Sequence, residues 1–227
     1  AVPAGEPIVR PISELEIPVR TVLLLDTSLS VSEKYRPTIN EIMNNLVANR
    51  MDRELITVAT FSDKINDIIQ DSNDYVQLKG AIDGISYVDQ ETYLTDVLYE
   101  LLESWNHSDE NVLYRVIVVS DGVDNNSVGY TKEELYSLVK EHPYPIYTVG
   151  CTYKNSDNSE QLKNMFALSR QTQTPFWLID DIGSAMDVVT GVAQGNDLLQ
   201  VTLPLPAELA DGAVKGVKIN ISTAQGD

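Results

Sequence analysis

Three oxygen-bearing side chains, Asp26, Ser28 and Ser30, alternate along a short segment that follows an apolar run. The run, residues 21–25 (TVLLL), is typical of a buried parallel strand. Because ligands bind at the carboxyl ends of strands in open α/β sheets, we expect the three side chains to converge there. Oxygen ligands with no histidine or cysteine nearby suit a hard cation such as Mg²⁺. The alternative is structural: a strand that ends in aspartate, followed by a helix with a serine cap.

Two later segments also place polar side chains at the ends of expected elements. Thr92 lies in residues 90–98 (QETYLTDVL), which open a helix with apolar periodicity. Asp121 follows a second buried strand, residues 116–120 (VIVVS), and precedes a glycine suited to a turn. Each segment therefore adds an oxygen ligand that the fold could bring to the same edge of a sheet.

Together the three segments resemble the von Willebrand factor type A (vWA) domain and its metal-ion-dependent adhesion site (MIDAS). That family has D-x-S-x-S after its first strand, a threonine at the start of a later helix, and an aspartate after its fourth strand. The resemblance covers roughly residues 19–195. It implies Mg²⁺, or else Mn²⁺ or Ca²⁺, as the cofactor, and an Asp or Glu carboxylate from a protein partner as a further ligand. The metal ligands that it implies are Asp26, Ser28, Ser30, Thr92 and Asp121.

Two positions depart from the family pattern. Leu29 stands where the first motif often has glycine, and residues 90–93 read QETY where the threonine loop is often G-G-T-N. Loss of the glycines should stiffen both loops, and it places the bulky Leu29 and Tyr93 near the rim of the site. The ligand atoms are retained, but the shape of the contact surface cannot be carried over from the family.

The order of elements predicts an α/β fold. Strands are expected at 19–25, 54–61, 65–69, 111–120, 145–151 and 175–179, and helices at 34–49, 74–85, 92–105, 131–141, 159–170 and 184–194. This alternation predicts a doubly wound, mostly parallel central sheet with helices on both faces, Rossmann-like as in vWA domains, plus a short C-terminal β segment. The strand at 65–69 should pair antiparallel at one edge.

The ends of the chain read differently from its middle. Residues 1–18 contain four prolines, which predicts an extended lead-in or linker before a vWA domain at 19–196. Residues 197–227 hold two alternating segments, 198–203 and 214–221, with no helix between them. They predict a β-hairpin or the start of a β-sandwich module. Because a lone hairpin is marginal in water, we expect this part to pack on the main domain or to be cut short at the end of the chain.

Composition narrows the function classes. The 227 residues are 43% hydrophobic, enough for one large α/β core, and no run is long enough to span a bilayer. A formal net charge of −18 argues against binding to nucleic acids or to anionic membrane surfaces. The chain starts without a charged and apolar leader, so we expect no signal peptide within it. We expect an extracellular or surface-attached bacterial protein that is monomeric as an isolated domain.

Two smaller features have structural interpretations. Cys151 is the only cysteine, so an internal disulfide is excluded, and we expect a small buried hydrophobe there. Asp180 and Asp181 precede the last expected helix, and we expect them to cap it or to favour its N-terminal dipole.

Four function classes remain. The sequence favours a metal-dependent protein-binding or adhesion module and not an enzyme. The alternative is a structural vWA scaffold in a larger assembly, with an inert metal site. A phosphatase that uses Asp26 as nucleophile would need a second carboxylate two residues on, where Ser28 stands. A nucleotide-binding domain would need a glycine-rich phosphate loop, and none follows any expected strand.

Overall fold

The chain forms two compact units, residues 16–197 and residues 1–15 with 198–227. The computed structural model describes residues 6–11, 14, 17–106, 112–124, 127–152, 159–195 and 199–204. Each unit is described by itself, and the larger one carries all five of the expected metal ligands.

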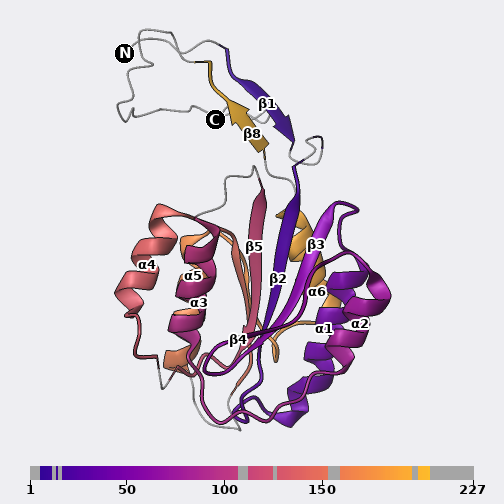
Figure 1. Ribbon diagram of the computed structural model, residues 1–227, viewed down its shortest axis with the longest axis vertical. Helices are drawn as coiled ribbons and strands as arrows, with labels where there is room; N and C mark the ends of the chain where they lie inside the picture. Colours follow the sequence, from indigo (N-terminus) through magenta and orange to yellow (C-terminus); the bar gives the residue numbers. More distant parts are fainter. Residues whose placement is uncertain are drawn as a thin grey trace. The chain divides into compact units, whose positions relative to one another are not determined.

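A six-stranded sheet in the order β4-β3-β2-β5-β6-β7 forms the centre of the larger unit (Figure 1). Every neighbouring pair is parallel except β3 and β4, which pair antiparallel at one edge as the sequence predicts. The strands are β2 (Val19–Asp26), β3 (Glu54–Phe61), β4 (Ile65–Ser72), β5 (Leu113–Ser120), β6 (Ile146–Gly150) and β7 (Phe176–Leu178).

Helices cover both faces of this sheet, which confirms the predicted doubly wound α/β fold (Figure 1). Successive side chains of a strand point to opposite faces, so Leu23 and Leu25 enter one core and Val22 and Leu24 the other. The first core packs on η2 (Glu33–Tyr35), α1 (Arg36–Ala48), α2 (Tyr75–Asp83) and α6 (Ala185–Gln194). The second packs on α3 (Leu94–Trp105), α4 (Lys132–Glu141) and α5 (Ser159–Gln171).

Register brings the ends of the central strands level. Leu25 of β2 lies opposite Thr60 of β3 on one side and Val119 of β5 on the other. The residues that follow β2 and β5 therefore emerge next to each other at the carboxyl edge of the sheet. This arrangement depends on no loop, because the parallel ladders fix it.

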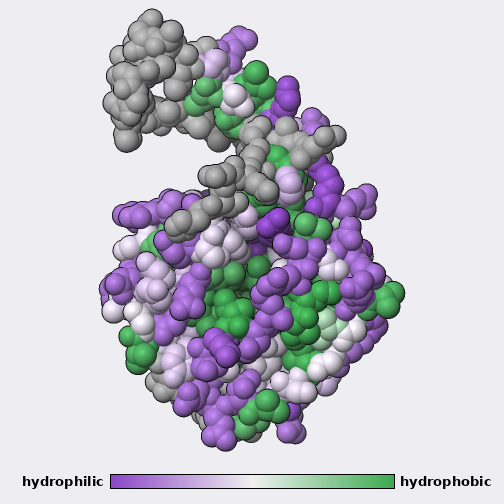
Figure 2. Space-filling view, viewed as in Figure 1, coloured by the Kyte–Doolittle hydropathy of each residue, from purple (hydrophilic) through white to green (hydrophobic). Residues whose placement is uncertain are grey.

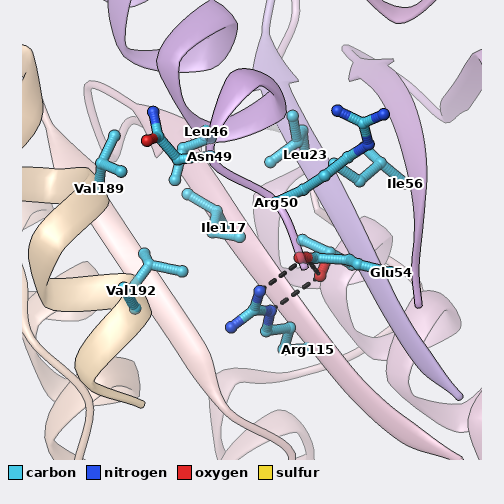
Figure 3. A pocket seen from close by; sticks show the side chains of 12 residues that line it. Leu23, Leu46, Asn49, Arg50, Glu54, Ile56, Arg115, Ile117, Val189 and Val192 are labelled. Atoms are coloured by element: carbon cyan, nitrogen blue, oxygen red, sulfur yellow. Dashed lines mark hydrogen bonds and ion pairs between the residues drawn. The ribbon is translucent and has the colours of Figure 1, made fainter. Parts of the chain in front are cut away.

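A buried ion pair lies toward the opposite end of the sheet. The guanidinium of Arg115 donates to Oε1 of Glu54 at 2.6 Å and to Oγ1 of Thr21 at 2.8 Å, and both charged side chains are at most 6% exposed. Beside the pair, side chains of α1 and α6 close a cavity of about 20 Å³ (Figure 3). The pair joins β2, β3 and β5 beneath those two helices, so the core here is polar yet hydrogen-bonded.

The smaller unit contains a two-stranded antiparallel sheet of β1 (Ile8–Pro11) and β8 (Leu199–Thr202). The alternating segment expected at 198–203 is thus a strand, and it pairs with a strand of the N-terminal lead-in. The second alternating segment, 214–221, lies outside the described residues.

The surface is largely hydrophilic (Figure 2), as expected for a chain in which 22% of the residues are charged. On the face shown in Figure 2, hydrophilic side chains predominate and apolar ones gather in separate patches. Among the helices of the described residues, none has both the length and the apolar character needed to cross a bilayer.

We predict that Arg115→Met destabilises the chain by about 3–5 kcal/mol, because it leaves the carboxylate of Glu54 buried without its cation. The double variant Glu54→Leu with Arg115→Met should lose much less stability, since it removes both charges. Urea unfolding of the two variants measures the difference. Equal losses in the single and double variants would contradict an energetic role for the pair.

Candidate metal site

Asp26 is the last residue of β2, and hydrogen bonds fix both of its carboxylate oxygens. The backbone N–H of Ser28 donates to Oδ1 at 2.9 Å, and the hydroxyl of Ser120 donates to Oδ2 at 2.7 Å. The carboxylate is fully buried. Ser120 ends the neighbouring strand β5, so the parallel pairing of β2 with β5 orients this carboxylate.

Ser28 and Ser30 turn toward each other in the loop that follows. Their hydroxyl oxygens lie 2.6 Å apart, and the N–H of Val31 donates to the carbonyl of Ser28 at 3.2 Å, which closes the loop. Ser28 is buried and Ser30 is half-buried. Ser28 therefore links the two ends of the motif, since its N–H bonds to Asp26 and its hydroxyl lies against that of Ser30.

Asp121 reaches the same edge from β5. It is fully buried, and its Oδ1 accepts the N–H of Val123 at 3.0 Å. Gly122 makes the turn with φ of 75°, and a Cβ there would come within 2.7 Å of the carbonyl oxygen of Gln161. Glycine is required at this position both for the backbone angle and for the close approach of α5.

Thr92 lies on the loop before α3, two residues ahead of the helix, and two tethers hold it. On one side, the N–H of Leu29 donates to the carbonyl of Asp89 at 2.8 Å, and Asp89 forms a short parallel bridge with Ser28. On the other, the N–H of Tyr93 donates to the carbonyl of Ser62 at 2.8 Å, just past the end of β3. Thr92 itself is buried. Loop pairing, and not the helix, thus brings this threonine to the Asp26 loop.

A second pair of carboxylates joins the Asp121 loop to α3. Asp124 accepts the N–H of Thr95 at 3.2 Å and also the Thr95 hydroxyl, and so caps a helix whose own N-cap residue supplies no side-chain bond. Asp96 accepts the backbone N–H groups of Val128 and Gly129, each at 3.0 Å. These contacts fix the loop that begins at Asp121 against the helix that follows Thr92.

The electrostatics of the site are unfavourable for a bare carboxylate. The pKa of Asp26 is raised from 3.8 to about 6, chiefly by burial and also by the negative charge of Asp121. Hydrogen bonds from Ser28 and Ser120 lower it, but they do not compensate. A cation bound between the two buried carboxylates would favour the ionised form of both.

The donor set fits a hard divalent cation. Its members offer carboxylate and hydroxyl oxygens, which Mg²⁺, Mn²⁺ and Ca²⁺ prefer. Across the described residues, no group of three or more His, Cys, Asp or Glu side chains could hold a metal. Cys151 is fully buried, as expected, and burial raises the pKa of its thiol, so a thiolate ligand is disfavoured.

The structure thus brings Asp26, Ser28, Ser30 and Asp121 to one edge, and it tethers Thr92 beside them. Their role as metal ligands stays a prediction. At the rim, Leu29 is 41% exposed, and the half-buried Tyr93 donates its hydroxyl to Glu91 at 3.2 Å.

Three supporting residues escaped the sequence analysis. Ser120 could have been found, because the expected pairing of two parallel strands places it beside Asp26. Asp89 and Asp124 carry no local signal, since their partners Thr27 and Thr95 are distant along the chain.

The expected cap of the last helix was wrong. Ser184 and Asp187 form a capping box at α6, whereas Asp180 bonds the hydroxyls of Tyr35 and Thr152. Asp180 therefore holds the segment after the Ser28–Ser30 loop.

Comparisons with known proteins agree with this geometry. The family model for the von Willebrand factor type A domain matches residues 21–189. Comparison with curated proteins gives no match.

Several solved structures share the fold. BatB from Bacteroides thetaiotaomicron is 15% identical, with a TM-score of 0.60 over 78% of this chain and 98% of that chain. The vWF domain of the type V pili tip protein Mfa5 from Porphyromonas gingivalis is 11% identical, with a TM-score of 0.60 over 83% and 99%. Proximal thread matrix protein 1 from the mussel byssus, described with a zinc-occupied MIDAS motif, is 18% identical, with a TM-score of 0.59 over 87% and 49%.

We predict that Asp26→Asn stabilises the metal-free protein at neutral pH. Because the folded-state pKa of about 6 lies above the unfolded-state value of 3.8, the Asp26 contribution favours folding below about pH 3.8 and is lost as pH rises through 6. The variant should gain up to about 3 kcal/mol at pH 7 and nothing near pH 4. Urea unfolding in EDTA at both pH values measures this, with the exposed Asp52→Asn as the matched control. A variant less stable than the parent at pH 7 would refute the prediction.

Proposed function

The chain belongs to the von Willebrand factor type A family, and from that premise we propose that it binds protein partners through a divalent cation. Asp26, Ser28, Ser30, Thr92 and Asp121 would hold the cation. A carboxylate from an Asp or Glu of the partner would complete its coordination. No catalytic role is assigned to any residue.

The observation that supports this proposal most directly is the burial of Asp26 beside Asp121 at the end of two parallel strands. The pKa of Asp26 is raised by that burial, so the fold places a carboxylate where it is ionised only at a cost. A cation bound between the two carboxylates would offset this cost. Side chains with strongly shifted pKa values occur more often at ligand-binding and catalytic sites than elsewhere in a protein.

The hydroxyls decide what the bound cation can do. Ser28, Ser30 and Thr92 offer neutral oxygens, so a cation that they coordinate keeps more of its charge than one held by carboxylates alone. When bound, the cation supplies a coordination position that an incoming carboxylate can fill. A central, desolvated contact of this kind can dominate the affinity of an interface.

We propose Mg²⁺ as the resident ion, with Mn²⁺ or Ca²⁺ as the other candidates. The all-oxygen donor set supports hard cations over zinc. Zinc occupies the MIDAS motif of the mussel protein, so it belongs in any metal comparison.

We also propose that the domain acts outside a bacterial cell, as a monomer. A vWF domain of similar fold belongs to a pilus tip protein, which supports this setting. A net charge of −18 disfavours nucleic acid and anionic lipid as partners.

A structural scaffold with an inert site is the second candidate. The observation that favours it is Leu29, a bulky side chain where the family often has glycine, which would obstruct the approach of a partner to the two serines. In that case the site would bind a cation without binding a partner.

We predict that saturating Mg²⁺ or Mn²⁺ raises the melting temperature by about 5–10 °C at a metal concentration near 100 times Kd, because metal binds only the folded form. Differential scanning calorimetry measures the shift. Ser28→Ala should abolish it and leave the metal-free melting temperature nearly unchanged, whereas the neighbouring Ser32→Ala should retain it. An undiminished shift in Ser28→Ala would count against the ligand assignment.

We predict that peptides selected from a random display library in Mg²⁺, and eluted with EDTA, share an Asp or Glu. Replacing that acid by Asn or Gln should abolish binding, because the amide cannot bring the negative charge that the cation attracts. Isothermal titration with synthetic peptides measures the loss, and Ser28→Ala protein is the control. Peptides that bind equally well in EDTA would leave only the scaffold function.

A further inference from the structure

A hollow of about 380 Å³ opens between α1 and the segment that follows α2. This volume falls in the range of pockets that bind small ligands or single side chains. Its accessible wall is about equally polar and apolar, and the floor is formed by core side chains. The lining residues are Leu25, Arg36, Ile39, Asn40, Met43, Ile82, Ile85, Ser86, Tyr87 and Val88.

The hollow adjoins the metal site along the chain at two points. Leu25 directly precedes Asp26, and Val88 directly precedes Asp89, whose backbone pairs with the Ser28 loop. The hollow therefore opens beside the loops that carry the expected metal ligands.

Arg36 brings a positive charge to this wall. Its guanidinium lies 4.4 Å from the ring centroid of Tyr87, and one amino group donates weakly to the carbonyl of Val31 at 3.5 Å. Its Nε is buried and has no hydrogen-bond partner among the residues that the structure describes. Its ion pair with Glu33 is long, at 3.8 Å, and the Glu33 side chain is 88% exposed, so water screens it. In a chain of net charge −18, this guanidinium beside the site still favours an acidic partner segment.

Each loop around the site also presents an exposed apolar side chain. Leu29 is 41% exposed on the Ser28 loop, Val88 is 68% exposed on the loop that leads to Thr92, and Val128 is 88% exposed on the loop after Asp121. Apolar side chains exposed together on the loops of one site indicate a contact surface for protein.

We propose that this hollow is a second anchor point for the protein partner. An apolar side chain of the partner, near the acid that binds the cation, enters between α1 and Val88. A carbonyl or carboxylate oxygen of the same segment accepts a hydrogen bond from Arg36. This inference rests on the proposed function, because the cation fixes the partner segment at the adjoining site.

The test uses two Ser→Trp variants of the whole chain. Ser86 is exposed at the hollow, so Ser86→Trp fills it, whereas the equally exposed Ser104 on α3 lies away from it and gives the control Ser104→Trp. The probes are the synthetic peptides selected in Mg²⁺, each with its apolar positions replaced singly by alanine. Calorimetric Mg²⁺ shifts of both variants should match the parent, which shows that fold and metal site are intact.

We expect one apolar position at a fixed spacing from the acid, whose replacement by alanine weakens binding to the parent roughly tenfold or more. The same loss should follow from Ser86→Trp but not from Ser104→Trp. The Ser86→Trp variant should bind the alanine peptide as tightly as it binds the selected peptide. The tryptophan has already removed the contact that the alanine replacement would remove. Arg36→Met should also weaken binding while the metal shift persists.

Two results would overturn the inference and they are distinguishable. If peptides bind through Mg²⁺ but Ser86→Trp binds them as tightly as the parent, the hollow is not an anchor and the proposed function stands. If no peptide binds in a Mg²⁺-dependent way to the parent, the proposed function fails, and the second anchor fails with it.

Discussion

Burial of the Asp26 carboxylate beside the buried carboxylate of Asp121 is the constraint on which the carboxyl edge of this sheet depends. The parallel ladders of β2 with β5 bring the two residues to adjacent strand ends, and burial removes the water that would screen them. Hydroxyl and amide donors hold Asp26 but leave its pKa raised. The fold therefore keeps a region of unfavourable charge that a cation can relieve, and the surrounding loops are organised around it.

The sheet holds a carboxylate differently at its other end. At the start of β3, opposite the start of β2, Glu54 meets the guanidinium of Arg115 and the hydroxyl of Thr21, so the charge is neutralised within the chain. That pair joins three strands, and its role is structural. The contrast supports the proposed function, because the chain itself neutralises the charge of Glu54, while the charge of Asp26 is left beside another carboxylate, where a cation would neutralise it.

In the proposed function, an acidic partner would approach a protein whose own net charge is −18, so their long-range electrostatic interaction is repulsive. Screening at physiological salt limits this repulsion to about 8 Å, so attraction to an acidic partner has to be local. A cation at the Asp26 loop and the guanidinium of Arg36 would supply it at two adjoining points. The exposed Leu29 and Val88 add apolar area there. The substitutions that remove family glycines thus reshape the contact surface and leave the ligand atoms in place.

The sequence by itself determined the fold class and the elements that carry the site, because buried parallel strands and capped helices have strong local signals. D-x-S-x-S after one strand and Asp121 after another were readable because strand ends need no long-range information. The tertiary structure alone decided how Thr92 is held, since loop pairings with Asp89 and Ser62 do so. It also decided that Asp124 caps α3, that Asp180 bonds Tyr35 and that β8 pairs with β1. Each is a contact between segments far apart along the chain, and no local pattern encodes such a pairing.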